Sequence, residues 1–335
     1  MIKKISILLL ISSVSFAQDK GQFESYSNPF YRTIVTESNN YDKLEKTEYK
    51  SFKMNFDGKQ IPQSLDEFTI VKAENPISQG NTGTCWCFST TSFYESEIHR
   101  ITGKNINLSE LYPVYFEYIE KARGYINSRG TTHLGEGSET NAVQRMMELY
   151  GIVPFSAYEG KPSDQPFYNH EKMFGEIKTY LNNCKSTNFW DEQAILSNVK
   201  SILNHYMGAP PTKFRYNGRT YTPKGFMRYV TRLNPNDYVD FMSLMQKPYW
   251  SQEEYKVPDN WWRSDAYYNV PLDDFMFAIK NAIENGYSIS IGGDVSESGY
   301  SSTHDVAMVP SYDIPSEFID ENARQFRFSN GTTTD

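Results

Sequence analysis

Residues 79–88 carry side chains whose types and spacing could do nucleophilic chemistry: Gln-Gly-Asn-Thr-Gly-Thr-Cys-Trp-Cys-Phe. The two glycines predict a tight loop, and the residues from Phe88 to Arg100 can continue it as a helix that ends at Gly103. Cys85 would then lie at a helix N-terminus. Unpaired backbone N–H groups and the helix dipole favour a thiolate over a thiol there, so the stretch predicts a cysteine nucleophile.

Gln79 lies six residues before this cysteine, so its side-chain amide can turn toward the same point. With the backbone N–H of Cys85, that amide would give two donors for an oxyanion that develops during attack on a carbonyl. Two other interpretations stay open. One is a buried free cysteine on a core helix, and the other is a redox protein built on Cys85-Trp86-Cys87, whose one-residue spacing disfavours it.

The pattern Gln-Gly-x-x-Gly-x-Cys-Trp-x-Phe resembles the active-site segment of papain-like cysteine peptidases. The resemblance implies an α+β papain-like fold of two lobes: a helical lobe with the nucleophile helix, and a β-sheet or barrel lobe that is incomplete in this chain. It implies hydrolysis of a peptide or protein substrate through a thiolate acyl-enzyme, with no cofactor. We expect no metal either, because the chain lacks a paired-histidine helix motif and a calcium loop.

The resemblance covers about Pro62 to Asp335, and we predict a peptidase domain over residues 61–335. Residues 160–270 exceed what a minimal papain-like domain requires, and this helical and aromatic insertion resembles the bleomycin hydrolase and aminopeptidase C branch. The landmarks shared with that branch are a helix from Asp191 to Gly208, Pro210-Pro211, a helix from Asp273 to Gly286, a strand over residues 287–291 and Gly293-Asp294-Val295.

Two more helices are predicted between the nucleophile and the insertion. Ser109 is a candidate N-cap for the first, which we expect to end at Gly124, and the second ends at Gly151. In papain-like enzymes a Gly-rich turn before the second helix pairs its backbone with the extended substrate. The resemblance assigns that role to Gly137, because glycine lets a peptide lie close, and it assigns Trp86 to substrate binding as well. An ordinary loop into a helix is the alternative for Gly137.

A papain-like enzyme also needs a histidine base, which an asparagine orients. In the bleomycin hydrolase branch a connecting segment follows Gly-x-Asp-Val and the base comes after it, so we expect the base beyond Asp335. His304, which precedes a strand-like run, is the alternative base of a shortened enzyme. No Asn-Ser-Trp-Gly occurs in the chain. His99 would lie on the nucleophile helix itself, about four turns from Cys85, and so cannot reach it. His133, His170 and His205 are predicted to be surface or packing residues.

Residues 1–17 combine a basic start, a short apolar run and a Ser-Phe-Ala end, which is typical of a secretory signal peptide cleaved before Gln18. We therefore expect an exported protein, periplasmic or secreted, with no membrane contact after cleavage; an N-terminal anchor is the alternative. Residues 18–60 are polar and predict an extension without a core of its own. The net charge of −8 and the scattered lysines and arginines make nucleic acid a poor partner.

The odd number of cysteines suggests a free reactive thiol. Cys85 and Cys87 would point away from each other on a helix and should not bridge, whereas a disulfide between Cys87 and Cys184 stays open. A second function also stays open, that of a non-catalytic peptide-binding relative that has lost its base. The branch is mostly hexameric and limits its cleft with a C-terminal arm that this chain does not show. A homo-oligomer and the choice between endopeptidase and aminopeptidase action are therefore left open.

Overall fold

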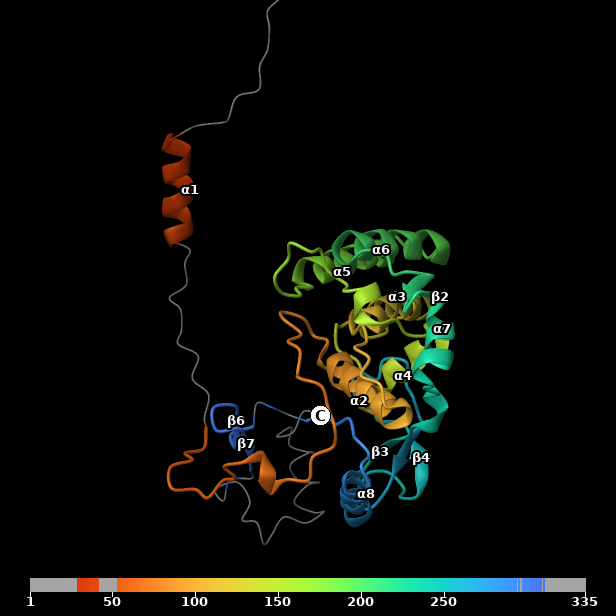
Figure 1. Ribbon diagram of the computed structural model, residues 1–335. Coiled ribbons are helices and arrows are strands. Elements are labelled where there is room, and N and C mark those ends of the chain that lie inside the picture. Colours follow the sequence, from red (N-terminus) through yellow and green to blue (C-terminus); the bar gives the residue numbers. More distant parts are fainter. Residues whose placement is uncertain (1–28, 42–52, 294, 296, 309, 311–335) are drawn as a thin grey trace, which may run out of the picture. The chain divides into compact units, whose positions relative to one another are not determined.

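The computed structural model describes residues 29–41, 53–293, 295, 297–308 and 310 (Figure 1). The predicted signal peptide lies outside these residues. The chain divides into two units, Met1–Phe52 and Lys53–Asp335. Within the first unit the structure describes one helix, α1 (Pro29–Tyr41), whose residues 29–37 are exposed and for which the sequence predicts only a polar extension.

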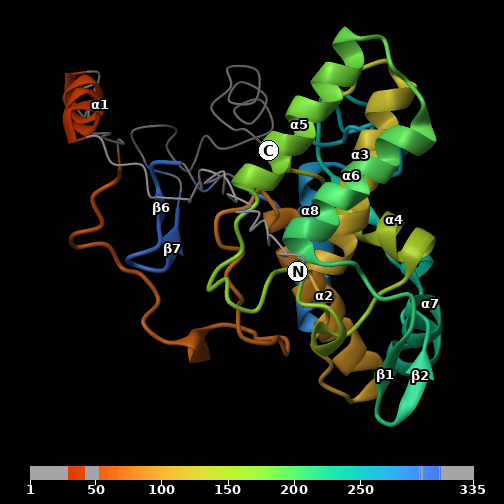
Figure 2. The ribbon, with the colours of Figure 1, turned by 90° about the horizontal axis from the view of Figure 1, so that it is seen from above.

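Five helices form the body of the second unit, and their apolar stripes build its core (Figures 1 and 2). They are α2 (Cys85–Thr102), α3 (Leu111–Asn127), α4 (Thr140–Tyr150), α5 (Glu171–Ser186) and α6 (Glu192–Met207). Helix α3 packs against α2, α4 and α6, and α6 packs against α5. The central helix of this body is therefore α3, which lies next to the helix that carries Cys85.

Helices α2, α4 and α6 form where the sequence predicts them, for local reasons. The Asp191 side chain accepts the Ala194 N–H at 2.9 Å and caps α6. Gly208 then ends α6 with a φ of 75°, as Gly151 ends α4 with a φ of 80°. Caps and glycine stops are short-range features, so the sequence alone locates these ends.

The predicted end of the helix after Ser109 is wrong. At its start, Glu110 rather than Ser109 stands at the N-cap position, although the Ser109 hydroxyl does accept the Tyr112 N–H at 3.1 Å. The helix α3 nevertheless runs through Gly124 to Asn127. Gly124 serves packing instead, since a β-carbon at this position would collide with the ring of Trp261, 137 residues further along the chain.

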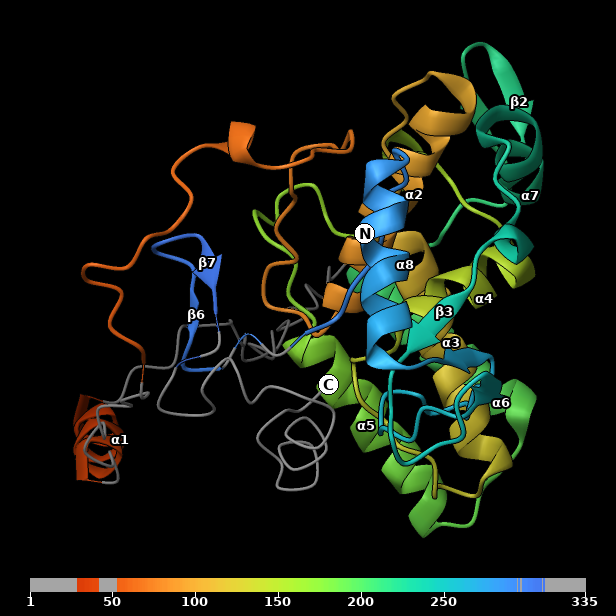
Figure 3. The same ribbon diagram turned by 90° about the horizontal axis from the view of Figure 1, so that it is seen from below.

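The strands of the described residues are short and belong to three small sheets. Strands β1 (Phe214–Tyr216) and β2 (Arg219–Tyr221) form a hairpin, which α7 (Pro223–Phe226) follows. Strands β3 (Asp240–Met242), β4 (Ser251–Glu253) and β5 (Tyr267–Asn269) form a sheet in the order β3-β5-β4, with β3 parallel and β4 antiparallel to β5. Helix α8 (Leu272–Glu284) lies beside this sheet, as Figures 1 and 3 show. A last hairpin joins β6 (Tyr300–Ser301) to β7 (Val306–Ala307).

Residues 287–291 do not form the predicted strand. A strand requires a ladder of hydrogen bonds with a neighbour, and no described strand pairs with this segment. The segment packs on α2 instead: the Ser290 hydroxyl lies 3.3 Å from that of Ser89, and the Arg100 guanidinium lies 4.5 Å from the centre of the Tyr287 ring. The alternating pattern does not mark a buried face here, because the side chains of Tyr287 and Ile291 are 45% and 67% exposed.

Among the described residues, no helix is both long enough and apolar enough to cross a bilayer.

Candidate active site

Cys85 is the first residue of α2, and its side chain is exposed. The Thr84 carbonyl accepts the N–H groups of Cys87 and Phe88 at 2.9 and 3.2 Å. The N–H groups of Cys85 and Trp86 donate to no acceptor in the described part of the chain. An exposed sulfur therefore lies beside unpaired donors at the positive end of a helix, the arrangement that the sequence predicts.

The other cysteines differ from Cys85 in exposure. Cys87 and Cys184 are buried, and all three cysteines are free. Cys87 and Cys85 point to different environments, as predicted, and the disulfide left open between Cys87 and Cys184 is not formed. The Cys87 thiol donates to the Glu110 carbonyl at 3.1 Å, and burial raises its pKa. Cys87 is therefore a packing residue.

Gln79 closes the loop before the nucleophile. Its Nε2 donates to the Thr82 carbonyl at 2.6 Å, and the Thr82 hydroxyl donates to the Gln79 carbonyl at 2.9 Å. An amide nitrogen carries two protons, so one fixes the orientation of the group and one remains for another acceptor. The predicted role of Gln79 as an oxyanion donor is untested by this geometry and stays a prediction.

Gly80 allows this loop to approach a segment of the predicted insertion. Its φ is 64°, and a β-carbon here would collide with the Tyr168 carbonyl oxygen. The adjoining Asn81 donates its N–H to that same carbonyl at 2.8 Å and accepts the His170 N–H at 3.2 Å. Residues 168–170 therefore anchor the loop that leads to Cys85.

A second loop, residues 134–138, lies against the other side of the nucleophile loop. The Glu136 carboxylate accepts the Gly83 N–H at 2.8 Å, and the Glu136 carbonyl accepts the Trp86 indole N–H at 3.3 Å. The structure thus brings together the segment predicted to carry the nucleophile and the segment to which the family resemblance assigns substrate binding. Trp86 itself is only 5% exposed, so its role in substrate binding stays a prediction.

Gly137 lies where Asp259 approaches the loop, because a β-carbon on Gly137 would collide with the Asp259 carboxylate. This close approach already explains why the position is a glycine. The Gly137 carbonyl accepts a hydrogen bond from Lys121, whereas its N–H has no acceptor among the described residues. The predicted pairing of Gly137 with a substrate backbone stays a prediction, with the N–H as the available group.

Two buried charged residues of α3 hold this second loop, and neither is among the site residues predicted from the sequence. Lys121 donates to the carbonyls of Gly135 and Gly137, and burial lowers its pKa although nearby carboxylates raise it. Glu117 accepts the Ser138 hydroxyl at 2.8 Å and the Trp261 indole N–H at 2.6 Å. The available signal was a Glu–Lys pair spaced i, i+4 on the apolar stripe of a helix.

All five histidines are described, and no hydrogen bond or ion pair in the described residues joins any of them to Cys85. His304 lies in the turn between β6 and β7, with Nδ1 2.8 Å from the Ser301 hydroxyl and its ring stacked on Phe56. His170 is buried beside the Tyr118 hydroxyl, and burial lowers its pKa to about 4. The remaining three contact other residues: His99 bonds Asn105, His133 lies 4.0 Å from Asp259, and His205 packs on Tyr206.

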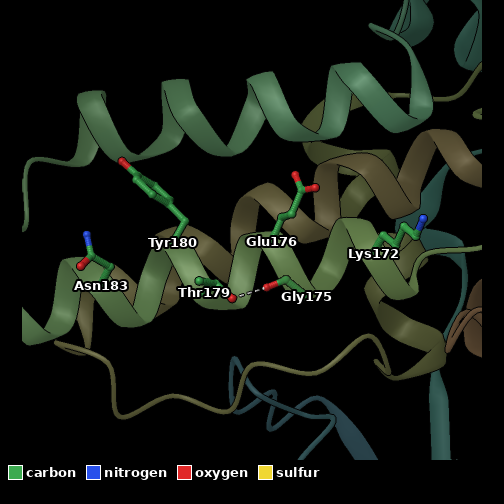
Figure 4. Close-up of a pocket in the computed structure, with 6 residues that line it drawn as sticks. All are labelled: Lys172, Gly175, Glu176, Thr179, Tyr180 and Asn183. Atoms are coloured by element: carbon green, nitrogen blue, oxygen red, sulfur yellow. Dashed lines mark hydrogen bonds between the residues drawn. The ribbon is translucent and has the colours of Figure 1, made fainter. Parts of the chain in front are cut away.

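A surface pocket of about 650 Å³ lies elsewhere, on α5 (Figure 4). Its lining comes from one face of that helix, and the Tyr180 and Glu176 side chains in it extend toward α6. Tyr180 accepts a hydrogen bond from Asn198, and Glu176 accepts one from Tyr206, so both groups serve the contact between the two helices. No cluster in the described residues has the three or more His, Cys, Asp or Glu side chains that a metal site needs.

Known proteins similar to this chain are cysteine peptidases and aminopeptidases. Aminopeptidase C from Streptococcus thermophilus is 23% identical over 279 residues, which cover 69% of this chain and 61% of the relative. Aminopeptidase C from Lactobacillus delbrueckii subsp. lactis is 22% identical over 263 residues, covering 66% and 59%. Germination-specific cysteine protease 1 from Arabidopsis thaliana is 29% identical over 124 residues, 32% of each chain. No protein-family model matches the chain.

The crystal structure of PepW from Lactobacillus rhamnosis HN001 has a similar fold, with a TM-score of 0.55 at 19% identity over 65% of this chain and 58% of that one. This likeness confirms the predicted α+β papain-like fold. The chain spans about three fifths of the length of the aminopeptidase C relatives. In sequence the chain is therefore similar to aminopeptidase C and to a cysteine protease, and in fold it is similar to PepW, as the resemblance to papain-like cysteine peptidases predicts.

Proposed function

We propose that the full-length protein is a cysteine peptidase of the aminopeptidase C kind, which hydrolyses peptide bonds through an acyl-enzyme on Cys85. The observation that carries this proposal is the exposed Cys85 sulfur at the start of α2, beside backbone N–H groups that have no acceptor in the part of the chain that the structure describes. The similarity to aminopeptidase C and to germination-specific cysteine protease 1 supports the same activity.

In the proposed reaction, the Cys85 thiolate attacks the scissile carbonyl carbon, and a C–S bond forms while an electron pair moves onto the carbonyl oxygen. That oxygen accepts hydrogen bonds from the Cys85 N–H and from the remaining N–H of the Gln79 amide. The C–N bond then breaks, and the leaving amine takes a proton from a histidine. Water hydrolyses the thioester and restores the thiol.

The histidine in this proposal lies beyond Asp335, with His304 as the second candidate. Support comes from the contacts of the five histidines, since each bonds or packs elsewhere among the described residues. The substrate would lie in an extended conformation along residues 134–138. The Gly137 N–H, which has no acceptor in the described residues, is the donor proposed for its backbone.

Alkylation tests the nucleophile. We expect iodoacetamide to label Cys85 in the folded full-length protein and to abolish cleavage, because Cys85 is exposed while Cys87 and Cys184 are buried. Peptide mapping by mass spectrometry locates the label, and fluorogenic aminoacyl and N-blocked peptide substrates, used in parallel, separate aminopeptidase from endopeptidase action. Cys85→Ala should be inactive and His304→Ala active.

A protein that still cleaves peptides after complete labelling of Cys85 would refute the proposal. Loss of activity in His304→Ala, at unchanged stability, would make His304 the base. Peptide binding without turnover, unaffected by Cys85→Ala, would favour a non-catalytic peptide-binding relative.

A further inference from the structure

Glu136 contacts the chain on both sides of the nucleophile. Its carboxylate accepts the N–H of Gly83, two residues before Cys85, and its carbonyl accepts the indole N–H of Trp86, the residue after it. The two contacts come from one residue of a loop that is about fifty positions away in sequence. Glu136 is therefore placed to control how the chain enters α2.

The fit between Glu136 and the nucleophile loop is close. A β-carbon on Gly83 would lie 2.8 Å from the Glu136 β-carbon, nearer than real β-carbons approach, so only glycine leaves the carboxylate within reach of the Gly83 N–H. Glu136 is half-buried, and its bond to Gly83 is 2.8 Å long. A charged acceptor at this distance makes one of the stronger classes of hydrogen bond.

The loop on either side of Glu136 is fixed from behind by α3. Lys121, which is fully buried, donates to the carbonyls of Gly135 and Gly137, the two neighbours of Glu136. The next residue, Ser138, donates its hydroxyl to the buried carboxylate of Glu117 at 2.8 Å. The backbone around Glu136 is therefore held in place by α3, and Glu136 in turn holds the loop before Cys85.

We propose that Glu136 is a positioning residue for the Cys85 reaction: by holding the Gly83 N–H, it fixes the direction of the Cys85 N–H relative to the sulfur. The inference rests on the proposed function, since this direction matters where an oxyanion forms. A carboxylate near a developing oxyanion repels it, so the useful property of Glu136 is its acceptor oxygen rather than its charge.

This reasoning separates two variants. Glu136→Ala removes the acceptor, and we expect kcat for peptide hydrolysis to fall about 10- to 100-fold with KM changed less than about threefold, the size of effect that follows a small misplacement of reacting groups. Glu136→Gln keeps an acceptor oxygen and removes the charge, so its kcat should stay within about threefold of the unaltered protein. Glu148→Gln, an exposed position on α4, is the matched control for loss of a carboxylate.

A second measurement does not depend on catalysis. Hydrogen–deuterium exchange at the Gly83 amide should accelerate in Glu136→Ala and remain slow in Glu136→Gln and Glu148→Gln. Thermal unfolding of each variant identifies any general loss of structure.

Unchanged kcat and unchanged Gly83 exchange in Glu136→Ala would overturn the inference. So would equal impairment of the Ala and Gln variants, which would assign the effect to charge. A full-length protein that cleaves no peptide would refute the proposed function instead, and Gly83 exchange would then still decide whether Glu136 holds the loop.

Discussion

Single glycines at the candidate site are required by particular neighbours. Gly80 is needed beside the Tyr168 carbonyl, Gly83 beside Glu136 and Gly137 beside Asp259. The sequence predicts that the first two form a close-approach loop, but it does not name the group that approaches. Those partners lie at least 50 positions away, and so they are set by tertiary packing, which a local pattern does not encode.

The same limit explains why Lys121 and Glu136 were missed. On the sequence they are ordinary charged residues, and their importance arises because Lys121 is buried against backbone carbonyls and Glu136 meets Gly83. Cys85 could be predicted because its chemistry depends on its own helix, whose glycines and start lie within ten residues.

Gly80→Ala should unfold more easily and lose activity. The left-handed φ of 64° costs an alanine about 1 kcal/mol, and the collision with the Tyr168 carbonyl adds to that cost. We expect a total of about 2–4 kcal/mol in the free energy of unfolding, measured by urea denaturation.

Gly103→Ala is the matched control, because Gly103 has a left-handed φ of 71° and no described atom lies near its missing β-carbon. The control variant should be destabilised only by the cost of its left-handed backbone conformation, and it should keep its activity. Equal losses in the two variants would mean that Tyr168 does not constrain the loop.

Helix ends were the most predictable feature at the scale of elements. The Asp191 cap and the glycines at 151 and 208 act within one turn, and the ends of α4 and α6 agree with the prediction. The helix end predicted at Gly124 and the strand predicted over residues 287–291 were wrong, because both depend on distant neighbours. A helix continues through a glycine when a distant ring such as Trp261 fills the space, and a strand does not form without a neighbour.

Two buried carboxyl groups connect α2 with the start of α3. Glu95 accepts the Leu108 N–H at 2.7 Å, whereas Oε2 of Glu110 has no partner among the described residues. Burial raises the pKa of each carboxyl to about 7. The folded chain therefore holds these protons at pH values where the unfolded chain has released them, so the pair stabilises the fold below pH 4.5, and this stabilisation is lost as pH rises toward 7.

Glu95→Gln should remove part of this pH dependence, because an amide does not ionise and its oxygen can still accept the Leu108 N–H. The stability of the variant relative to the original chain should rise by about 2 kcal/mol between pH 5 and pH 8. Urea denaturation at several pH values measures this difference, with the exposed Glu171→Gln as the control. Parallel stability curves for Glu95→Gln and the original chain would contradict the assignment.

The described molecule buries its apolar residues unevenly. Helices α2 to α6 share one core, whereas α8 contributes no buried side chain among the described residues, although one of its faces is apolar. Phe277 of α8 is 68% exposed, and Trp250, just before β4, is 71% exposed. We infer that the stability of this unit comes mainly from the helical side, which also carries Cys85.

We further propose that the working molecule is exported and lacks residues 1–17. Expression in its own host should give a mature protein that begins at Gln18, because the segment before it has the basic, apolar and small-residue order of a signal peptide. N-terminal sequencing and intact mass of the protein from the envelope or the medium measure this. A chain that retains Met1 and stays with the membrane fraction would support an anchor instead.

The bonds between Asn81 and residues 168–170 make the reactive end of α2 dependent on a distant part of the same chain. A partly denatured molecule that released residues 168–170 would keep its helices and its exposed thiol, yet the groups around the sulfur would lose their fixed directions. Peptide hydrolysis would then be lost at a lower denaturant concentration than helical content, so activity would report the first step of unfolding of this molecule.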